Sequence, residues 1–357
     1  MQAVASSGDL IVAVGSHRSQ ASAWVSDDGL EWFFAANIFD SDVFGLEDKA
    51  EGQSGFLARM TSVTVGGPGF VAVGSAQSTD GELGDNGFVS QSLSFGAVWL
   101  SVDGVIWEVV GPDPAVFGAR TGVPQQVWDV VGPSSQSGQG LPLVAVGVEG
   151  RGEDETIALV WVSDDGREWE SVPAEAVEGD SEGSLMFSVA GADAGYVAAG
   201  IAVSDGVPFP ATWFSSDGSE WTVTALPDDS STAFVEVTGW GSSFYAAAGN
   251  RVWASRDGQT WEIAYELPEN PPPGFQIRTV AASQYGVAAG SCGLVTTSDG
   301  TNWTYWPETG ACEAGPLASA GFGNSIAWAT DRIVAVSTAS ALDFIASSFS
   351  LVGRRQP

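Results

Sequence analysis

The stretch Ser26-Asp27-Asp28-Gly29-Leu30-Glu31-Trp32 decides the fold of this 357-residue chain, because its pattern returns five more times. The pattern is a Ser or Thr, any residue, Asp-Gly, two further residues and a Trp. The other copies span residues 101–107, 163–169, 215–221, 255–261 and 297–303. Self-similarity at a regular spacing is typical of repeat architectures, so we expect equivalent units rather than unrelated domains.

A second phrase, of the type Val-Ala-Val-Gly, precedes each copy of this box. It occupies residues 12–15, 71–74, 144–147, 197–200, 246–249 and 287–290, and a seventh version at 334–337 has no box after it. Another short β-like run precedes each phrase, as in Ser62–Val65 and Phe234–Val237. Each unit therefore predicts four short strands, A to D, joined by hairpin turns. Four antiparallel strands in about forty residues are typical of one β-propeller blade.

The residue types of the box suit a tight turn between strands C and D. The short Asp side chain can accept hydrogen bonds from turn N–H groups that have no partner in the ladder. Gly adopts a positive φ without steric cost, and the Ser or Thr hydroxyl ties the other side of the turn. The closing Trp is expected to bury its ring between neighbouring blades. We therefore assign a structural role to the six box aspartates, Asp28, Asp103, Asp165, Asp217, Asp257 and Asp299.

These boxes resemble the Asp-box, or BNR, repeat of sialidase-type and related β-propellers, including photosystem-assembly-factor-like ones. The common family form has one more residue between Asp and Gly, and all six copies here lack it. The resemblance covers about residues 1–340 and implies an all-β propeller. Enzymes and non-enzymes both carry such boxes, so the resemblance implies little about activity.

We predict one propeller domain over residues 1–357, with seven blades and six as the alternative. The units span approximately 1–36, 60–111, 126–173, 185–226, 233–266, 276–307 and 324–353. Unit boundaries coincide with both ends of the chain, so no spare strand is expected to close the ring across the termini. Either the seventh blade is incomplete or the natural chain continues beyond this sequence.

Composition excludes several classes of function. The chain has 12 Lys+Arg against 44 Asp+Glu, a formal net charge of −32, and its one lysine is Lys49. Nucleic-acid binding requires basic clusters, so it is excluded, and docking on anionic lipid is disfavoured. One histidine and two cysteines do not make a zinc cage. A hydrophobic content of 44% excludes a disordered chain.

The start of the chain has no basic region followed by a long apolar one, and no apolar run is long enough for a spanning helix. We expect a secreted or surface-exposed monomer from which a leader has been removed, with a cytoplasmic protein as the alternative. Cys292 and Cys312 fall in two loops of the sixth unit that belong to the same face. A disulfide between them is predicted, and two free thiols are the alternative.

The B–C and D–A connections lie on the face opposite the boxes, and they are longest in blades 1 to 4. Long loops on a rigid scaffold commonly carry binding sites, so this face is the predicted functional one. One of these loops holds Asp80, Glu82 and Asp85, whose oxygens near glycines make a candidate Ca²⁺ site. A solvated acidic loop without metal is the alternative, and no other cofactor is expected.

Arg59, Arg120 and Arg278 lie just ahead of predicted innermost strands, where guanidinium groups could clamp a ligand carboxylate. In the sialidases that the boxes resemble, a cluster of three arginines binds sialic acid in this way. Salt bridges with the surplus carboxylates are the alternative role. A sialidase-like mechanism also needs a tyrosine nucleophile, and Tyr265 with Glu266 is the pair closest to a D–A loop.

The sequence thus predicts a non-enzymatic binding or scaffold propeller that recognises a glycan or a protein through the long-loop face of blades 1 to 4. The first alternative is an exo-acting glycoside hydrolase that uses the three arginines with Tyr265 and Glu266. The second alternative is an assembly factor for a larger complex.

Overall fold

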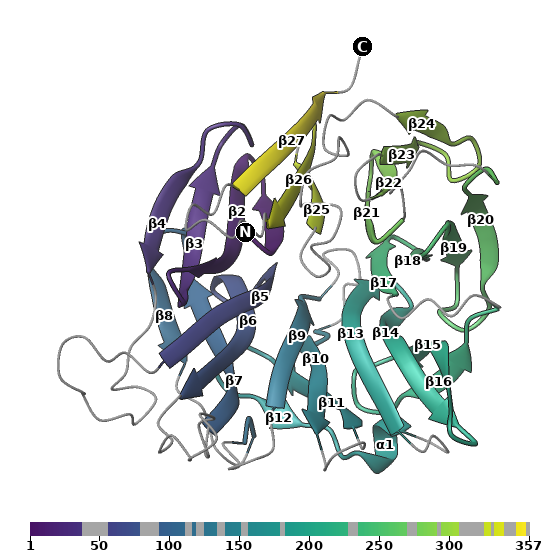
Figure 1. Ribbon diagram of the computed structural model, residues 1–357, viewed down its shortest axis with the longest axis horizontal. Helices are drawn as coiled ribbons and strands as arrows, with labels where there is room; N and C mark the ends of the chain where they lie inside the picture. The colour runs from purple at the N-terminus through teal and green to yellow at the C-terminus, as the bar shows by residue number, and fades with distance from the viewer. Residues whose placement is uncertain are drawn as a thin grey trace, which may run out of the picture.

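The computed structural model describes residues 1–37, 56–78, 93–110, 116–118, 125–133, 140–150, 156–178, 183–227, 235–269, 277–290, 294–306, 325–329, 332–338 and 348–354. Within these ranges the chain is almost entirely β-structure, and the strands form antiparallel sheets around a common axis (Figure 1). The one helix described, α1, is a single turn at Glu175–Glu178. No described helix has the length and apolar character that crossing a bilayer requires.

Six sheets have four strands each, and successive strands in the chain are neighbours in the sheet. The first two sheets comprise β1 (Ala3–Ser7), β2 (Leu10–His17), β3 (Gln20–Ser26) and β4 (Phe33–Asn37), then β5 (Phe56–Gly66), β6 (Gly69–Ser78), β7 (Leu93–Ser101) and β8 (Trp107–Val110). The next two comprise β9 (Gln125–Val131), β10 (Leu143–Gly150), β11 (Thr156–Ser163) and β12 (Glu170–Ser171), then β13 (Gly183–Ala192), β14 (Gly195–Ser204), β15 (Val207–Ser215) and β16 (Thr222–Ala225). The fifth and sixth comprise β17 (Glu236–Trp240), β18 (Ser243–Ala248), β19 (Arg251–Ser255) and β20 (Glu262–Glu266), then β21 (Thr279–Ser283), β22 (Gly286–Gly290), β23 (Leu294–Thr297) and β24 (Thr304–Trp306).

A seventh sheet has three described strands, β25 (Ser325–Ala329), β26 (Arg332–Thr338) and β27 (Ser348–Arg354). Its first strand lies beside both β21 and β1. Ser6 Oγ donates to Trp328 O at 2.6 Å, and Trp328 Nε1 donates to Ala281 O at 3.3 Å, so hydrogen bonds join this sheet to both neighbours. The fold is an all-β propeller with six complete four-stranded blades, the number given above as the alternative, and the seventh unit forms this three-stranded sheet.

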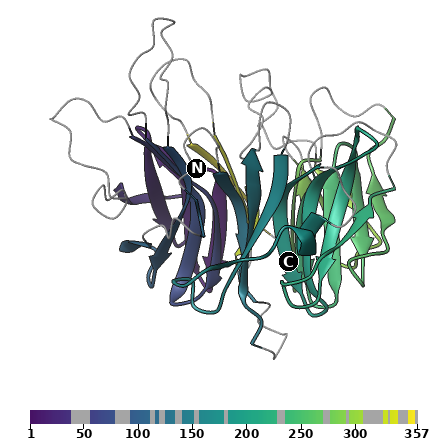
Figure 2. The same cartoon turned by 90° about the horizontal axis from the view of Figure 1, so that it is seen from below.

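The first strands of the sheets form the inner ring. Strands β1, β5, β9, β13, β17, β21 and β25 each lie beside the next, and β25 lies beside β1. Figure 2 shows the sheets from the side, with their strands running between the two faces of the ring. Packing of β1 against β25 closes the ring, because none of the described strands crosses from one sheet into another.

The hydrophobic core is divided into layers between neighbouring sheets. One layer joins the first and second sheets, where Val14 and Ala23 pack with Trp99 and the half-buried Trp107. A similar layer lies at each of the other junctions. The strand-C tryptophans Trp99, Trp161, Trp213 and Trp253 are completely or almost completely buried in these layers. Each box tryptophan lies in the layer shared with the preceding sheet, so the repeated tryptophans join blades.

The repeated box forms one turn at the end of each C strand. In the first blade, Asp28 Oδ1 accepts hydrogen bonds from Leu30 N at 2.7 Å and Glu31 N at 2.9 Å, and Gly29 N donates to Ser26 Oγ. In every box, the glycine N–H donates to the Ser or Thr and the following N–H donates to the Asp. All six box glycines have a positive φ, from 71° to 88°. Hydrogen bonds from the N–H groups of Thr260 and Gln259 lower the pKa of Asp257 to about 2.

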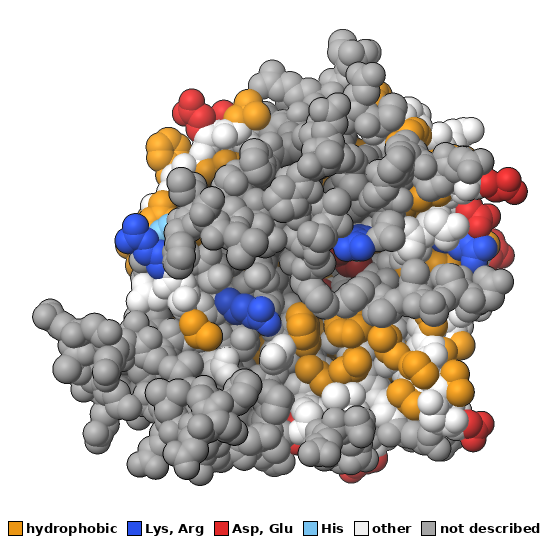
Figure 3. Space-filling view, in the orientation of Figure 1, with side chains coloured by type: hydrophobic (Ala, Val, Ile, Leu, Met, Phe, Trp, Pro, Cys, Tyr) orange, Lys and Arg blue, Asp and Glu red, His pale blue; other side chains and the backbone are white. Residues whose placement is uncertain are grey.

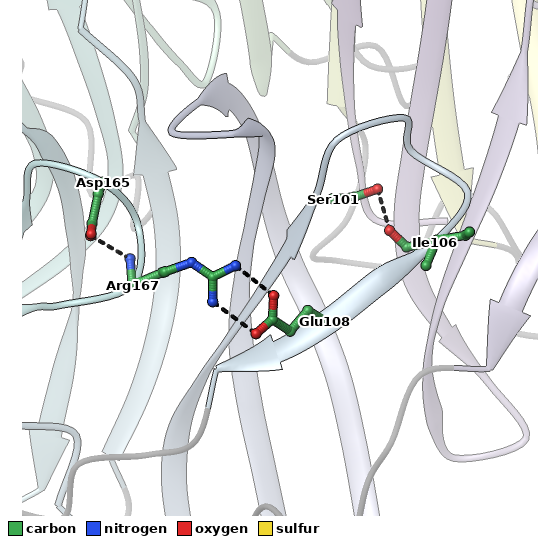
Figure 4. A network of polar contacts seen from close by, with 5 residues as sticks. All are labelled: Ser101, Ile106, Glu108, Asp165 and Arg167. Atoms are coloured by element: carbon green, nitrogen blue, oxygen red, sulfur yellow. Dashed lines mark hydrogen bonds and ion pairs between the residues drawn. The ribbon is translucent and has the colours of Figure 1, made fainter.

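The third box also contacts the preceding blade. Arg167, in the third box, makes a bidentate ion pair with Glu108 on β8 of the second blade, with N–O distances of 2.7 and 2.6 Å (Figure 4). Both side chains are about half exposed. Exposed ion pairs contribute little to stability because water and salt screen the charges.

We therefore expect Arg167→Ala to leave the melting temperature within about 1 °C of the wild-type value. Thermal unfolding of the wild type, Arg167→Ala, Glu108→Ala and the double variant at low and high salt measures the coupling between the two charges. A clear coupling that persists at high salt would contradict this expectation.

Candidate functional site

The inner strands carry a carboxylate that connects three blades. Asp129, on β9, accepts a hydrogen bond from Ser62 Oγ on β5 at 2.6 Å and one from Val130 N at 2.8 Å through the same oxygen. Its other oxygen accepts from Val189 N on β13 at 2.8 Å. Although part of the residue surface stays accessible, protein atoms surround the carboxylate, and this burial raises the pKa of Asp129.

A second carboxylate occupies a comparable place on another inner strand. Glu236, on β17, accepts a hydrogen bond from Thr279 Oγ1 on β21 at 2.9 Å. Burial raises the pKa of Glu236 to about 8, and the charge of Asp129 adds to the shift. A carboxyl group with such a pKa retains its proton at neutral pH, the state that a general acid requires. Hydrogen bonds to neighbouring sheets nevertheless give both groups a role in joining the blades.

Three consecutive inner strands contain a β-bulge at equivalent positions. The unpaired residues are Thr61 on β5, Trp128 on β9 and Phe187 on β13. Bulges redirect side chains and are common beside functional sites. Opposite each bulge stands the last glycine of the repeated Val-Ala-Val-Gly phrase, Gly74, Gly147 or Gly200. A Cβ at Gly147 would lie 2.0 Å from Gln126 O, so the phrase ends in glycine because the bulged backbone comes too close for a side chain.

Two of these bulge residues form an aromatic and cationic cluster with Arg59. The guanidinium carbon of Arg59 lies 5.9 Å from the centre of the Trp128 ring, within the range of a cation–π contact. The Trp128 and Phe187 rings meet edge to face, with their centres 5.9 Å apart. All three side chains are half-buried, so each keeps some accessible surface. We call Arg59, Trp128 and Phe187 the inner-strand cluster.

Of the inner-strand cluster, Arg59 lies toward the face opposite the boxes. Gly67, in the turn after β5, lies against the third box, since a Cβ there would meet Asp165 O at 2.6 Å. An extended strand of about 23 Å separates Arg59 from that turn, so Arg59 lies toward the opposite face. Figure 3 views that face, where hydrophobic side chains gather below and to the right of the middle and a few basic side chains lie mainly above and to the left of them.

The predicted arginines come from separate parts of the ring. Arg59 lies on β5, whose inner neighbours are β1 and β9, whereas Arg278 precedes β21, whose inner neighbours are β17 and β25. Arg278 is exposed. The two residues therefore belong to non-adjacent blades, and Arg120 lies outside the described residues.

The structure does not bring Tyr265 and Glu266 to the inner strands. Both lie on β20, which is the outermost strand of its sheet and stands three strands, about 14 Å, from β17. Tyr265 packs against Trp303 with the ring centres 5.3 Å apart, and burial raises the pKa of its phenol, which disfavours the nucleophilic phenolate. Arg251 Nε donates to Glu266 Oε1 at 2.9 Å.

The remaining predicted positions lie outside the described residues. They are the candidate calcium ligands Asp80, Glu82 and Asp85 and the candidate disulfide Cys292–Cys312. Within the described ranges, no three His, Cys, Asp or Glu side chains are grouped so that they could hold a metal ion.

Sequence reasoning missed Trp128, Phe187, Asp129 and Glu236. A signal was present for the first, because Trp128 is one of four tryptophans, with Trp240, Trp306 and Trp328, that stand outside the repeated positions. The two carboxylates also interrupt inner-strand segments that are otherwise apolar, Val127–Val131 and Val235–Val237. An ionisable residue inside an apolar strand needs a partner or a function, so both positions were identifiable.

The fold and its inner-strand cluster define an all-β propeller with polar and aromatic groups on the inner strands. No family model matches the chain, and no curated protein matches it. Solved structures that resemble it include the Trypanosoma rangeli sialidase, with 14% identity, a TM-score of 0.44 and coverage of 82% of this chain and 54% of that one. The chain therefore spans about half the length of that sialidase.

Two further similar structures are known glycan-processing proteins. One is the phage phi92 endosialidase, with 10% identity, a TM-score of 0.46 and coverage of 100% of this chain and 67% of that one. The other is a thermostable family-43 glycoside hydrolase, with 13% identity, a TM-score of 0.43 and coverage of 76% of this chain and 94% of that one. At such identities the likeness concerns the class of fold and says nothing about the activity of this chain.

Proposed function

We propose that this chain is a non-enzymatic binding propeller that recognises an acidic glycan through the face opposite the boxes. The observation that carries the proposal is the inner-strand cluster, in which Arg59 lies over Trp128 and Trp128 meets Phe187. Ligand sites commonly combine aromatic surface with a few polar groups that fix the orientation of the ligand. An arginine beside two aromatic rings suits a sugar ring that bears a carboxylate.

Charge supports this choice of ligand class. A chain with a net charge of −32 repels anions in general, so an anionic ligand needs a local cation to bind. Arg59 supplies such a charge on a rigid inner strand. We also propose, on compositional grounds, that the protein acts as a monomer outside the cytoplasm and that neither nucleic acid nor membrane lipid is its ligand.

A glycan array with the wild-type protein, Arg59→Gln and Arg167→Gln tests the proposal. Arg167 provides a matched control, because it is an arginine on the box face. We expect Arg59→Gln to weaken binding to carboxylated glycans at least tenfold, equivalent to about 1.4 kcal/mol. Arg167→Gln should leave binding unchanged, and EDTA reports whether calcium takes part. Equal binding by wild type and Arg59→Gln, or no glycan binding at all, would contradict the proposal.

The hydrolase alternative has a specific observation in its favour, the raised pKa values of Asp129 and Glu236 on inner strands. We give it second place because hydrogen bonds from Ser62, Val130 and Val189 already engage both oxygens of Asp129. Assays with fluorogenic sialosides and other aryl glycosides separate the two functions. Turnover by the wild type that Glu236→Gln abolishes, while Tyr265→Phe leaves it intact, would replace the binding proposal.

A further inference from the structure

The second box differs from the other five on its exposed surface. Its three variable positions are Val102, Val105 and Ile106, and all three are apolar. At the same positions the sixth box has Ser298, Thr301 and Asn302, and the other four boxes have at most one apolar residue. Because all six boxes form the same hydrogen-bonded turn, the fold does not require apolar residues there.

These apolar side chains are not used to build the core. Val102 is 75% exposed, Ile106 76% and Val105 42%. The backbone of the turn is fixed, because Ser101 Oγ accepts from Gly104 N at 2.8 Å and donates to Ile106 O at 2.6 Å (Figure 4). The turn therefore presents its side chains on a rigid support. Fixed, exposed apolar groups are typical of recognition surfaces.

Neighbouring turns extend the apolar surface on the same face. A Cβ at Gly69 would lie 2.8 Å from Val102 O, so the hairpin between β5 and β6 lies beside the second box, and this hairpin carries the exposed Val65. In the first box, the exposed apolar residue is Leu30, 56% exposed. Gly104 packs against Leu10, Val12 and Val25 of the first blade, so the second box lies at the junction of blades 1 and 2.

Acidic side chains surround this surface. The first three boxes and the start of β8 contain eight carboxylates and one base, Arg167, which is paired with Glu108. The carboxylates are Asp27, Asp28, Glu31, Asp103, Glu108, Asp164, Asp165 and Glu168. Hydrogen bonds from Ile106 N and Val105 N lower the pKa of Asp103, so the second box carries a negative charge at neutral pH.

We propose that Val102, Val105 and Ile106, with Val65 and Leu30 on neighbouring turns, form a docking surface for a basic segment of a partner protein that presents apolar side chains flanked by Lys or Arg. Charge complementarity favours this occupant over a second copy, because two chains of net charge −32 repel each other. The surface lies on the box face, so the proposal is independent of the glycan site on the opposite face.

A labelled amphipathic peptide of leucine and lysine serves as the probe, and a leucine and glutamate peptide of the same pattern serves as its charge control. Fluorescence anisotropy near physiological salt compares the wild type with a triple variant, Val102→Ser, Val105→Thr and Ile106→Asn, whose residue types occur in other boxes. Asp103 and Gly104 remain, so the turn should still form, and the melting temperature checks this. Val207→Thr is the matched control, since Val207 is also highly exposed but lies on the hairpin between β14 and β15.

We expect the triple variant to bind the basic peptide at least tenfold more weakly than the wild type, and Val207→Thr to bind it as the wild type does. The acidic peptide should not bind. Equal binding by wild type and triple variant would overturn the proposal, because net charge alone would then explain it. A wild-type dimer in sedimentation experiments, or binding to zwitterionic vesicles, that the triple variant abolishes would also overturn it.

Discussion

Replacing Gly200 by alanine is expected to destabilise the propeller by at least about 3 kcal/mol, or to prevent folding. A Cβ at this position would lie 1.8 Å from Leu185 O, a backbone atom of the bulged strand β13. A backbone carbonyl cannot turn away as a flexible side chain can, so β13 and β14 must separate. That separation disturbs the ladder that positions Phe187. For a chain of this length, such a loss corresponds to a fall in melting temperature of about 4 °C or more.

Gly140→Ala provides the matched control, because a Cβ at Gly140 would meet no atom within 4 Å. This substitution should leave the melting temperature unchanged or raise it slightly, since alanine restricts the unfolded chain. Thermal unfolding followed by circular dichroism compares the two variants with the wild type. If Gly200→Ala unfolds at the wild-type temperature, the close approach of β13 and β14 is not an essential feature of this fold.

The contrast between these glycines shows what the sequence can predict. The boxes predicted the propeller because each residue acts locally, within one turn, and six copies repeat the same hydrogen bonds. The glycine that ends the Val-Ala-Val-Gly phrase was recognised as part of the repeat, but the physical reason for a glycine at this position was not. The reason is a bulge in the neighbouring strand, which brings a backbone carbonyl close to the glycine. Sequence periodicity does not show which carbonyl comes close to which Cα.

The candidate site was less predictable for the same reason. Arg59 was identified because it lies just ahead of a predicted inner strand, yet its partner Trp128 comes from the next blade, 69 positions later in the chain. Asp129 likewise meets Ser62 and Val189, which belong to the two blades on either side of it. Contacts between blades depend on strand register and on bulges. A single sequence reveals the elements but not these pairings.

The second large expected effect is a loss of stability as the pH rises, and it comes from Glu236. Its pKa in the folded protein is about 8, whereas the ordinary value is 4.5. Below the ordinary pKa, both the folded and the unfolded chain hold the proton, and the group does not affect the free energy of unfolding. Between the two values, the unfolded chain ionises while the folded chain retains its proton, so the free energy of unfolding falls as the pH rises. Above pH 8, the folded chain ionises too, and the loss reaches its limit.

Glu236→Gln should remove this dependence, because the amide carries no charge at any of these pH values and its oxygen can still accept from Thr279 Oγ1. At pH 9 we expect the variant to exceed the wild type in stability by a few kcal/mol, after allowance for partial solvent access, and by nothing measurable at pH 4.5. Urea unfolding of both proteins at pH 4.5, 6, 7.5 and 9 measures the difference. Glu262→Gln removes the same charge from an exposed position on β20 and should follow the wild type throughout. Parallel curves for wild type and Glu236→Gln would mean that water reaches the carboxylate freely, and the inner strands would then be hydrated around it.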